Sequence, residues 1–168
     1  MGKISTKENK SIYQITREEL GYSRAKAADI IAEIEDGKYS YLNENKLVKI
    51  EDGTVAIQSQ DVVAMSKAYG KPELRNYYCC HECPIGEIDT PVVSGTNSIH
   101  EILVNMAVSL ESINAKKVRL MEILADGKVD SDEINDLNKI LEELEKISMT
   151  VEAIQLWCEK MKIKTKDK

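Results

Sequence analysis

The sequence predicts an all-α protein, with a head of four to five short helices followed by a long antiparallel helical hairpin. The composition favours helices over sheets, because the 168 residues include no Phe, only 3 Pro and only 8 Gly, and Leu, Ile, Glu, Lys and Ala dominate. Short amphipathic segments separated by Gly fill the first half of the chain. Two longer segments with heptad spacing fill the second half and predict the hairpin.

The first two helices of the head are bounded by Gly21 and Ser23. A helix from about Ile12 to Leu20 is expected to end at Gly21, because glycine readily takes the left-handed conformation found just past helix ends. Ser23 is expected to cap a second helix that ends at Asp36-Gly37. Its apolar residues fall at helical spacing and predict one buried face, made of Ala27, Ile30, Ile31 and Ile34.

Two more helices and a turn complete the head. Asn43 is expected to cap a third helix that ends at Asp52, and Ser59 to cap a fourth that ends near Gly70. A short turn over residues 73–78 then leads into the cysteines. The residues that we expect to face inward from the third and fourth helices are Leu47, Ile50, Val62, Val63, Met65 and Ala68.

Residues 84–96 contain two Pro and two Gly among short polar residues, and we predict a linker and domain boundary there. Beyond it, apolar residues recur at alternating spacings of four and three, which predicts an antiparallel hairpin over residues 97–163 with a turn at 125–132. Lys117 is the only charged residue in the two seams. The seams are Ile99, Leu103, Met106, Leu110, Ile113, Lys117, Leu120 and Leu124, then Leu137, Ile140, Leu144, Ile147, Val151, Ile154, Cys158 and Met161.

A lone two-helix hairpin leaves much of each seam exposed, because each helix covers only one side of its neighbour. Two copies packed as a four-helix bundle would cover more of both seams. We therefore expect a homodimer formed through this coiled-coil hairpin. The alternative is that the hairpin packs onto the head of its own chain.

The net charge of −6 does not exclude a nucleic-acid partner, because the charge is unevenly distributed. Residues 1–76 carry 12 basic and 12 acidic side chains, whereas residues 77–168 carry 11 and 17. A neutral head can still present a basic face. No apolar run is long enough to span a membrane and the N-terminus lacks the apolar core of a signal peptide, so we expect a cytoplasmic protein.

Residues 47–53 read Leu-Val-Lys-Ile-Glu-Asp-Gly, which resembles the end of the recognition helix in the Xre family of phage-repressor-like helix-turn-helix proteins. There the pattern is apolar, any, basic, Ile, Glu, any, Gly. Residues 72–86, together with 125–127, 141–148 and 155–157, resemble more narrowly a Firmicutes group with a Tyr-Cys-x-x-Glu-Cys-Pro-Ile-Gly segment and a C-terminal helical hairpin.

The resemblance implies a helix-turn-helix head over residues 12–83 and a sequence-specific DNA-binding transcription regulator of bacterial or phage type. It also implies that Glu51 anchors the head internally. The chain departs from the family between Ser23 and Gly53, because this unit spans 31 residues and is longer than the usual one. The excess falls around residues 35–42.

If the head binds double-stranded DNA, we expect the third helix to enter the major groove. Asn can pair with adenine, and Lys can contact guanine or phosphate. Arg24 opens the second helix, where the positive end of the helix dipole suits a phosphate. Glu44 either accepts a hydrogen bond from cytosine or weakens binding. The DNA-binding candidates are Arg24, Asn43, Asn45, Lys46 and Lys49.

Cys79, Cys80 and Cys83, with His81, include the ligand types of a zinc site, but no second ligand pair follows. We therefore expect neither metal nor cofactor, and we expect Cys79 and Cys83 to pack as small apolar side chains between head and linker. A reversible thiol pair or an intersubunit metal site remains the alternative.

We do not expect an enzyme, because no nucleophile, base and orienting group can be assembled and no glycine-rich phosphate loop is present. Two other functions stay open beside DNA binding. One is a protein-interaction adaptor with a degenerate helix-turn-helix head. The other is a thiol-responsive or metal-responsive regulator.

Overall fold

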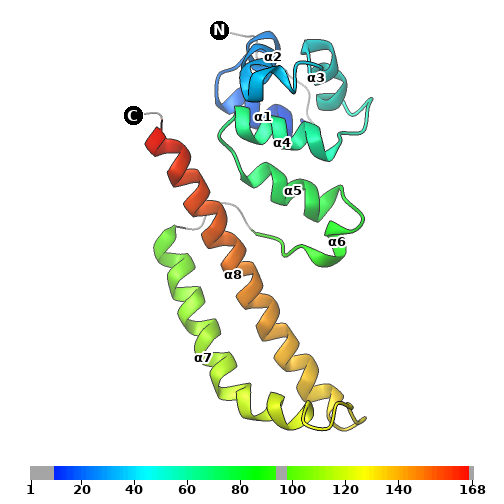
Figure 1. Ribbon diagram of the computed structural model, residues 1–168, viewed down its shortest axis with the longest axis vertical. Helices are drawn as coiled ribbons and strands as arrows, with labels where there is room; N and C mark the ends of the chain where they lie inside the picture. Colours follow the sequence, from blue (N-terminus) through cyan, green and yellow to red (C-terminus); the bar gives the residue numbers. More distant parts are fainter. Residues whose placement is uncertain (1–9, 94–97, 167–168) are drawn as a thin grey trace. The chain divides into compact units, whose positions relative to one another are not determined.

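The computed structural model describes residues 10–93 and 98–166, and all regular elements in these ranges are helical (Figure 1). The all-α prediction is therefore confirmed. The described residues form two compact units, one of residues 10–90 with 163–166, and one of residues 91–93 with 98–162. The elements are α1 (Ile12–Glu19), α2 (Arg24–Glu33), the 3-10 helix η1 (Ile34–Gly37), α3 (Glu44–Glu51), α4 (Ser59–Ala68), α5 (Glu73–His81), α6 (Gly86–Asp89), α7 (Ile99–Ile123) and α8 (Ile134–Lys166).

Side-chain caps fix where the helices of the head begin. The Ser23 hydroxyl accepts a hydrogen bond from the Lys26 N–H, and the Asn43 carboxamide accepts one from the Lys46 N–H, so both predicted caps are confirmed. Ser59 is not a cap, which corrects that prediction. Gln58 precedes the first residue of α4, and its N–H donates to the Asp61 carboxylate at 3.2 Å, so the helix begins one residue earlier.

The core of the head is a single apolar cluster contributed by α1 to α5 and the α2–α3 connection. Six of the predicted inward residues are fully buried: Ala27, Ile31, Leu47, Ile50, Val62 and Met65. Ile30, Ile34, Val63 and Ala68 are only half-buried. The cluster also includes residues outside the predicted set, namely Tyr13, Tyr39, Leu42, Ala64, Tyr69 and Leu74.

The connection between α2 and α3 holds the excess residues that distinguish this head. The second helix was expected to reach Asp36-Gly37, but α2 ends at Glu33 and η1 follows, with Glu35 and Asp36 at φ values of 49° and 54°. Such left-handed positions are unusual for residues other than glycine. Buried Tyr39 and Leu42 pin the connection to the core, and Glu35 forms ion pairs with Lys38 and with Lys67 of α4.

The cysteine segment is more helical than predicted. The expected turn at 73–78 is instead the first part of α5, which continues through Cys79 and Cys80. The predicted linker contains the short helix α6, and residues 94–97 of it lie outside the described residues. A Cβ on Gly86 would lie 2.3 Å from the backbone oxygen of Cys79, so only glycine permits this approach of α6 to α5.

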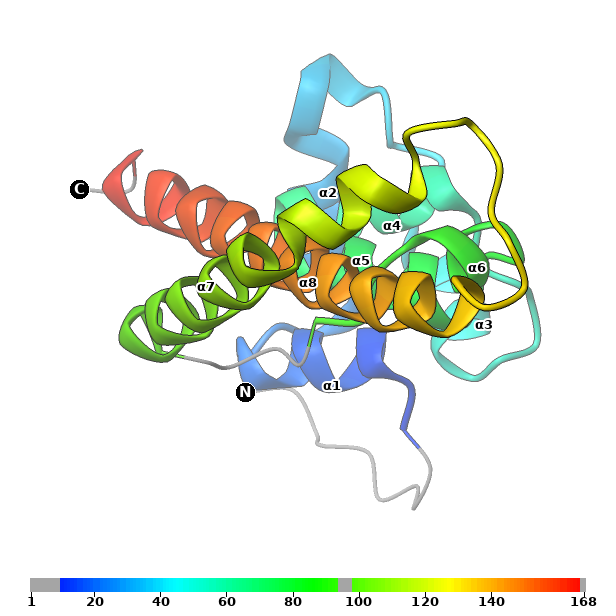
Figure 2. The same ribbon diagram turned by 90° about the horizontal axis from the view of Figure 1, so that it is seen from below.

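Helices α7 and α8 run side by side in opposite directions, as both ribbon views show (Figure 2), and form the predicted hairpin. The most buried residues of α7 are Ile102, Ser109 and Ile123, which lie beside the predicted seam and not on it. Leu103, Leu110 and Leu124 of that seam are 53%, 42% and 54% exposed. The hairpin alone therefore leaves much of its apolar surface uncovered.

The ion pairs between the two helices and a row of exposed leucines lie on opposite sides of the hairpin. Lys116 lies 3.4 Å from Glu143, and Arg119 lies 3.0 Å from Asp136, so these pairs join the two helices along one side. Leu103, Leu110 and Leu124 each follow a buried residue of α7 by one position. Each leucine therefore lies about 100° around the helix axis from that buried residue, on the side opposite the ion pairs. We call this surface the outer apolar row; it comprises Leu103, Leu110, Leu124, Leu141, Leu144 and Val151.

In the ranges that the structure describes, no helix is both long and apolar enough to pass through a membrane.

Candidate nucleic-acid interface

Helix α3 presents a polar face and buries an apolar one. Leu47 and Ile50 enter the core at 0% and 4% exposure, while Asn45 and Lys49 are exposed. Neither of these two polar side chains pairs with another described residue. Their amide and ammonium groups are thus available to an external partner.

Asn43 lies at the exposed start of α3 and has a structural task. Its carboxamide oxygen accepts the Lys46 N–H at 3.1 Å, which fixes the first turn of the helix. The amide nitrogen of the same side chain still offers two hydrogens. Asn43 can therefore cap α3 and donate to a partner at once.

Lys46 is held inside the head. Its ammonium lies 2.8 Å from Asp61, whose side chain is fully buried, and 4.5 Å from the centre of the Tyr41 ring. Desolvation, followed by the nearby Asp61 carboxylate, raises the pKa of Tyr41. Because a buried carboxylate needs a counter-charge, Lys46 stabilises the contact between α3 and α4, which its sequence position does not reveal.

Glu51 ties the end of α3 to α1 and α2, and its internal role agrees with the prediction. Arg17 donates to both Glu51 oxygens, at 2.6 and 2.8 Å, and Arg24 Nε donates to one of them at 2.8 Å. The Glu51 side chain is 0% exposed. Hydrogen bonding to Glu51 raises the pKa of Arg17, so Arg17 stays protonated.

Arg24 is the second candidate whose charge is engaged within the head. Its Nε is committed to Glu51, but its Nη atoms make no hydrogen bond to the residues that the structure describes, and its side chain is 29% exposed. Lys26, two residues further along the first turn of α2, is exposed and lies over the Tyr22 ring. Sequence reasoning missed Lys26, although its place at a helix N-terminus beside Arg24 could have revealed it.

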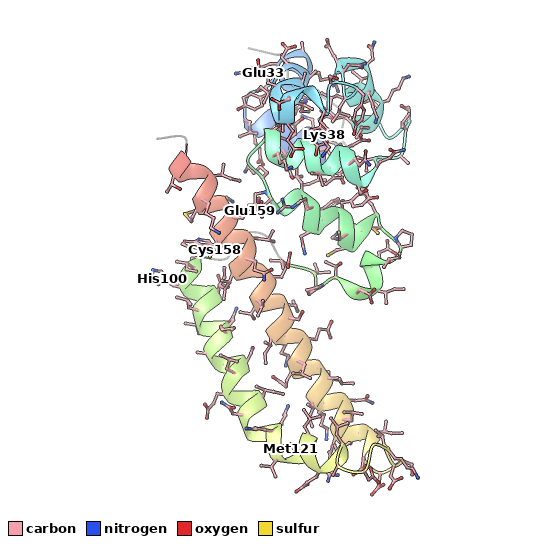
Figure 3. The ribbon with its side chains drawn as sticks, viewed as in Figure 1. Glu33, Lys38, His100, Met121, Cys158 and Glu159 are labelled. Atoms are coloured by element: carbon pink, nitrogen blue, oxygen red, sulfur yellow. The ribbon has the colours of Figure 1, made fainter. Side chains whose placement is uncertain are left out.

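The cysteines connect α5 to α6. Cys79, Cys80 and Cys83 are half-buried, and the Cys80 thiol lies 3.7 Å from both the Asn76 side-chain oxygen and the Thr90 carbonyl. Cys158 and His100 lie on α8 and α7, where both are exposed (Figure 3). Across residues 10–93 and 98–166, no three His, Cys, Asp or Glu side chains are arranged to hold a metal ion.

The groups on the exposed face of α3 suit recognition by hydrogen bonding. They include no concentrated positive charge, because Glu44 and Asp52 are exposed on the same helix and at its end. Comparison of the chain with protein-family models, curated proteins and solved structures gives no match.

Proposed function

We propose that the protein is a sequence-specific, DNA-binding transcription regulator of the Xre helix-turn-helix type that acts as a homodimer. The arrangement around Glu51 carries this proposal. Its paired carboxylate holds α3 against α1 and α2, while Asn45 and Lys49 project outward from the same helix. A recognition helix needs this combination of a locked backbone and exposed donors.

The contacts divide between base reading and positioning. Asn45 and Lys49 are the residues best placed to read bases, and Asn43 adds its amide hydrogens at the start of α3. Arg24 and Lys26 lie in the first turn of α2, where a cationic side chain and the helix dipole together favour a phosphate. Lys46 serves primarily as the partner of Asp61.

The long connection between α2 and α3 is compatible with this function. Tyr39 and Leu42 are 4% and 1% exposed, so the extra residues are packed onto the head and do not loosen α3. The recognition helix keeps its anchors at both ends, through the Asn43 cap and the buried Glu51.

The outer apolar row of the hairpin supports the homodimer. Six large apolar side chains on one side of a two-helix layer are between 38% and 54% exposed. A second copy presents the same surface, and two such layers pack as a four-helix bundle with two-fold symmetry. A dimer of this kind would bind a palindromic operator.

The deciding experiment starts with selection of bound DNA from a random pool and then measures binding to the selected site at several salt concentrations. We expect Lys49→Ala to cost about 1–3 kcal/mol at one base position, or to lower the salt slope by about 1 if Lys49 contacts a phosphate. Asn45→Ala should relax specificity at one position. Lys38→Ala is the control, because Lys38 is an exposed lysine of the head outside α3.

Lys46 calls for a different variant, because Lys46→Ala alone would leave the buried Asp61 without its cation. The double variant Lys46→Met/Asp61→Asn removes both charges, and circular dichroism checks its fold. Unchanged affinity in folded Lys49→Ala and Asn45→Ala proteins would remove α3 as the recognition helix. The protein-interaction adaptor would then be the better proposal. The exposed Glu44 supports that alternative, because a carboxylate on α3 is unfavourable next to DNA phosphates.

A further inference from the structure

A groove of about 330 Å³ lies on the hairpin, between α7, α8 and residues 92–93. It opens on the side that carries the ion pairs, opposite the outer apolar row. Its apolar walls come from Val93, Ile102, Val108 and Met149. This volume is at the lower end of the range for small-molecule sites.

The floor of the groove contains a hydroxyl group without a partner. Ser109 is 7% exposed and lines the groove, and its hydroxyl makes no hydrogen bond to any residue that the structure describes. The amide of Asn105, one helical turn earlier, also lines the groove and is equally without a partner there. Both groups are open to the groove and have hydrogens to donate, so they can hydrogen-bond a polar ligand atom there.

One end of the groove is positively charged. Lys146 lies 3.0 Å from Glu143, and Lys116 lies 3.4 Å from the same carboxylate oxygen, so two cations share one anion. Hydrogen bonds from Lys146 and Ser112, together with the charges of Lys116 and Lys146, lower the pKa of Glu143, so it stays ionised at neutral pH. The three side chains carry one net positive charge, and the Lys146 side chain is 58% exposed at the rim.

The register of the hairpin separates the polar end from the apolar end. The pairs Lys116–Glu143 and Arg119–Asp136 place Ser109 level with the turn from Lys146 to Thr150. The same register places Ile102 level with Ala153 and the residues that follow it. Ser109 and Lys146 therefore lie toward one end of the groove, Ile102 and Ala153 lie toward the other, and Asn105 lies between them.

We propose that this groove binds a small aliphatic carboxylate. Its carboxylate lies between Lys146 and the Ser109 hydroxyl, and its hydrocarbon chain extends along Ile102 and Ala153. Val92 and Val93 form part of the wall, so the bound acid contacts the segment that enters the hairpin. The site is independent of DNA binding by the head and does not rest on it.

The test uses the full chain and hexanoate as the probe, with hexanol as the uncharged analogue. Trp157 is the single tryptophan of the chain and lies one turn beyond Ala153, so its fluorescence reports on the apolar end. Calorimetry gives a second reading that does not depend on Trp157. We expect hexanoate to bind with a Kd of roughly 1 mM or below, and hexanol to bind more weakly.

Lys146→Met should weaken hexanoate about tenfold, because it removes a charge-assisted contact. Lys139→Met is the matched control, since its side chain is also 58% exposed and also pairs with a carboxylate three residues earlier, but it does not line the groove. Ala153→Leu should block binding by filling the apolar end, and Ser109→Ala, a smaller change, should weaken it. Circular dichroism verifies the helicity of each variant.

Three results would overturn the proposal. The first is the absence of hexanoate binding at millimolar concentration. The second is equal binding of hexanoate and hexanol, and the third is an equal effect of Lys146→Met and Lys139→Met. Operator binding is measured separately on the same proteins, so failure of the groove and failure of DNA recognition give distinct results.

Discussion

Two buried tyrosines of the head differ in how their hydroxyl groups are satisfied. Tyr13 donates to Glu82 at 3.2 Å and so joins α1 to the end of α5. The Tyr69 hydroxyl is buried and has no hydrogen-bond partner among the described residues. Desolvation raises the pKa of both side chains above the ordinary value of 10.0, and charge repulsion from Glu51 adds to the effect at Tyr69.

We expect Tyr69→Phe and Tyr13→Phe to have different effects on stability at neutral pH. Tyr69→Phe removes an unsatisfied hydroxyl and should be neutral or stabilising by up to about 1 kcal/mol, whereas Tyr13→Phe loses a hydrogen bond to a charged group and should cost about 1.5–3 kcal/mol. Urea unfolding of the two variants measures both values. Equal destabilisation by the two changes would contradict this account of Tyr69.

The same variants make a prediction about alkaline pH. A raised folded-state pKa means that the contribution of the neutral tyrosine is complete below the unfolded pKa of about 10 and is lost as pH rises above it. Tyr69→Phe should therefore flatten the fall in stability above pH 10 relative to the unmodified chain. Unfolding curves from pH 8 to 11 test the slope.

At the scale of helices, Gly86 is the residue on which the contact between α5 and α6 depends. An added Cβ would lie within 2.9 Å of three backbone atoms of Cys79, and backbone cannot move aside as a flexible side chain can. We expect Gly86→Ala to destabilise the head by about 1–3 kcal/mol, the usual cost of overpacking. Glu87→Ala, at an exposed neighbouring position, should change stability by less than about 0.5 kcal/mol.

Thermal unfolding followed by circular dichroism compares the two variants. A Gly86→Ala protein as stable as the Glu87→Ala protein would show that α6 separates readily from α5. The contact between α5 and α6 would then contribute little to the stability of the head.

Local signals in the sequence predicted much of the head. Gly21 and the caps Ser23 and Asn43 act within a few residues of chain, so α1 ends just before Gly21, and α2 and α3 begin directly after their caps. The prediction that Ser59 caps α4 was wrong because the Asp61 carboxylate accepts a hydrogen bond from the Gln58 N–H. This hydrogen bond makes Gln58 the capping residue in place of Ser59. The cysteine helix was missed because its end depends on tertiary contact with Gly86.

The candidate site was harder to predict, because its charges pair over long distances in the chain. Lys46 and Asp61 are 15 positions apart, and Arg24 and Glu51 are 27 apart. Spacing within one helix does not reveal such pairs, so Lys46 and Arg24 looked as available as Lys49. In the hairpin, heptad spacing predicted two amphipathic helices. Two neighbouring rows of apolar residues on α7 could each face α8, however, and the spacing alone did not show that the row with Ile102 and Ile123 would be buried.

For the whole molecule, the division of the hairpin into an ionic side and an apolar side has the clearest test. We expect the chain to be a dimer in sedimentation experiments, and we expect Leu110→Glu/Leu144→Glu to make it monomeric. Burying a leucine is worth about 1.5–3 kcal/mol, so losing two per chain should raise the dimer Kd by at least about 100-fold.

The control for this prediction is Val104→Glu, because Val104 is 61% exposed on the back of α7, away from the outer apolar row. This variant should remain dimeric with unchanged helicity. A monomeric unmodified chain at tens of micromolar, or equal dissociation by both sets of substitutions, would mean that the outer apolar row is not the interface.

An interface confined to the hairpin also determines how the regulator would respond to its own abundance. Below the dissociation constant of the dimer, the concentration of dimers rises as the square of the concentration of chains, by mass action. A twofold increase in synthesis then gives about a fourfold increase in the species able to span a two-fold operator. The apolar leucines of α7 and α8 would thus set a threshold of expression, and single substitutions along them would move that threshold without altering which DNA sequence is read.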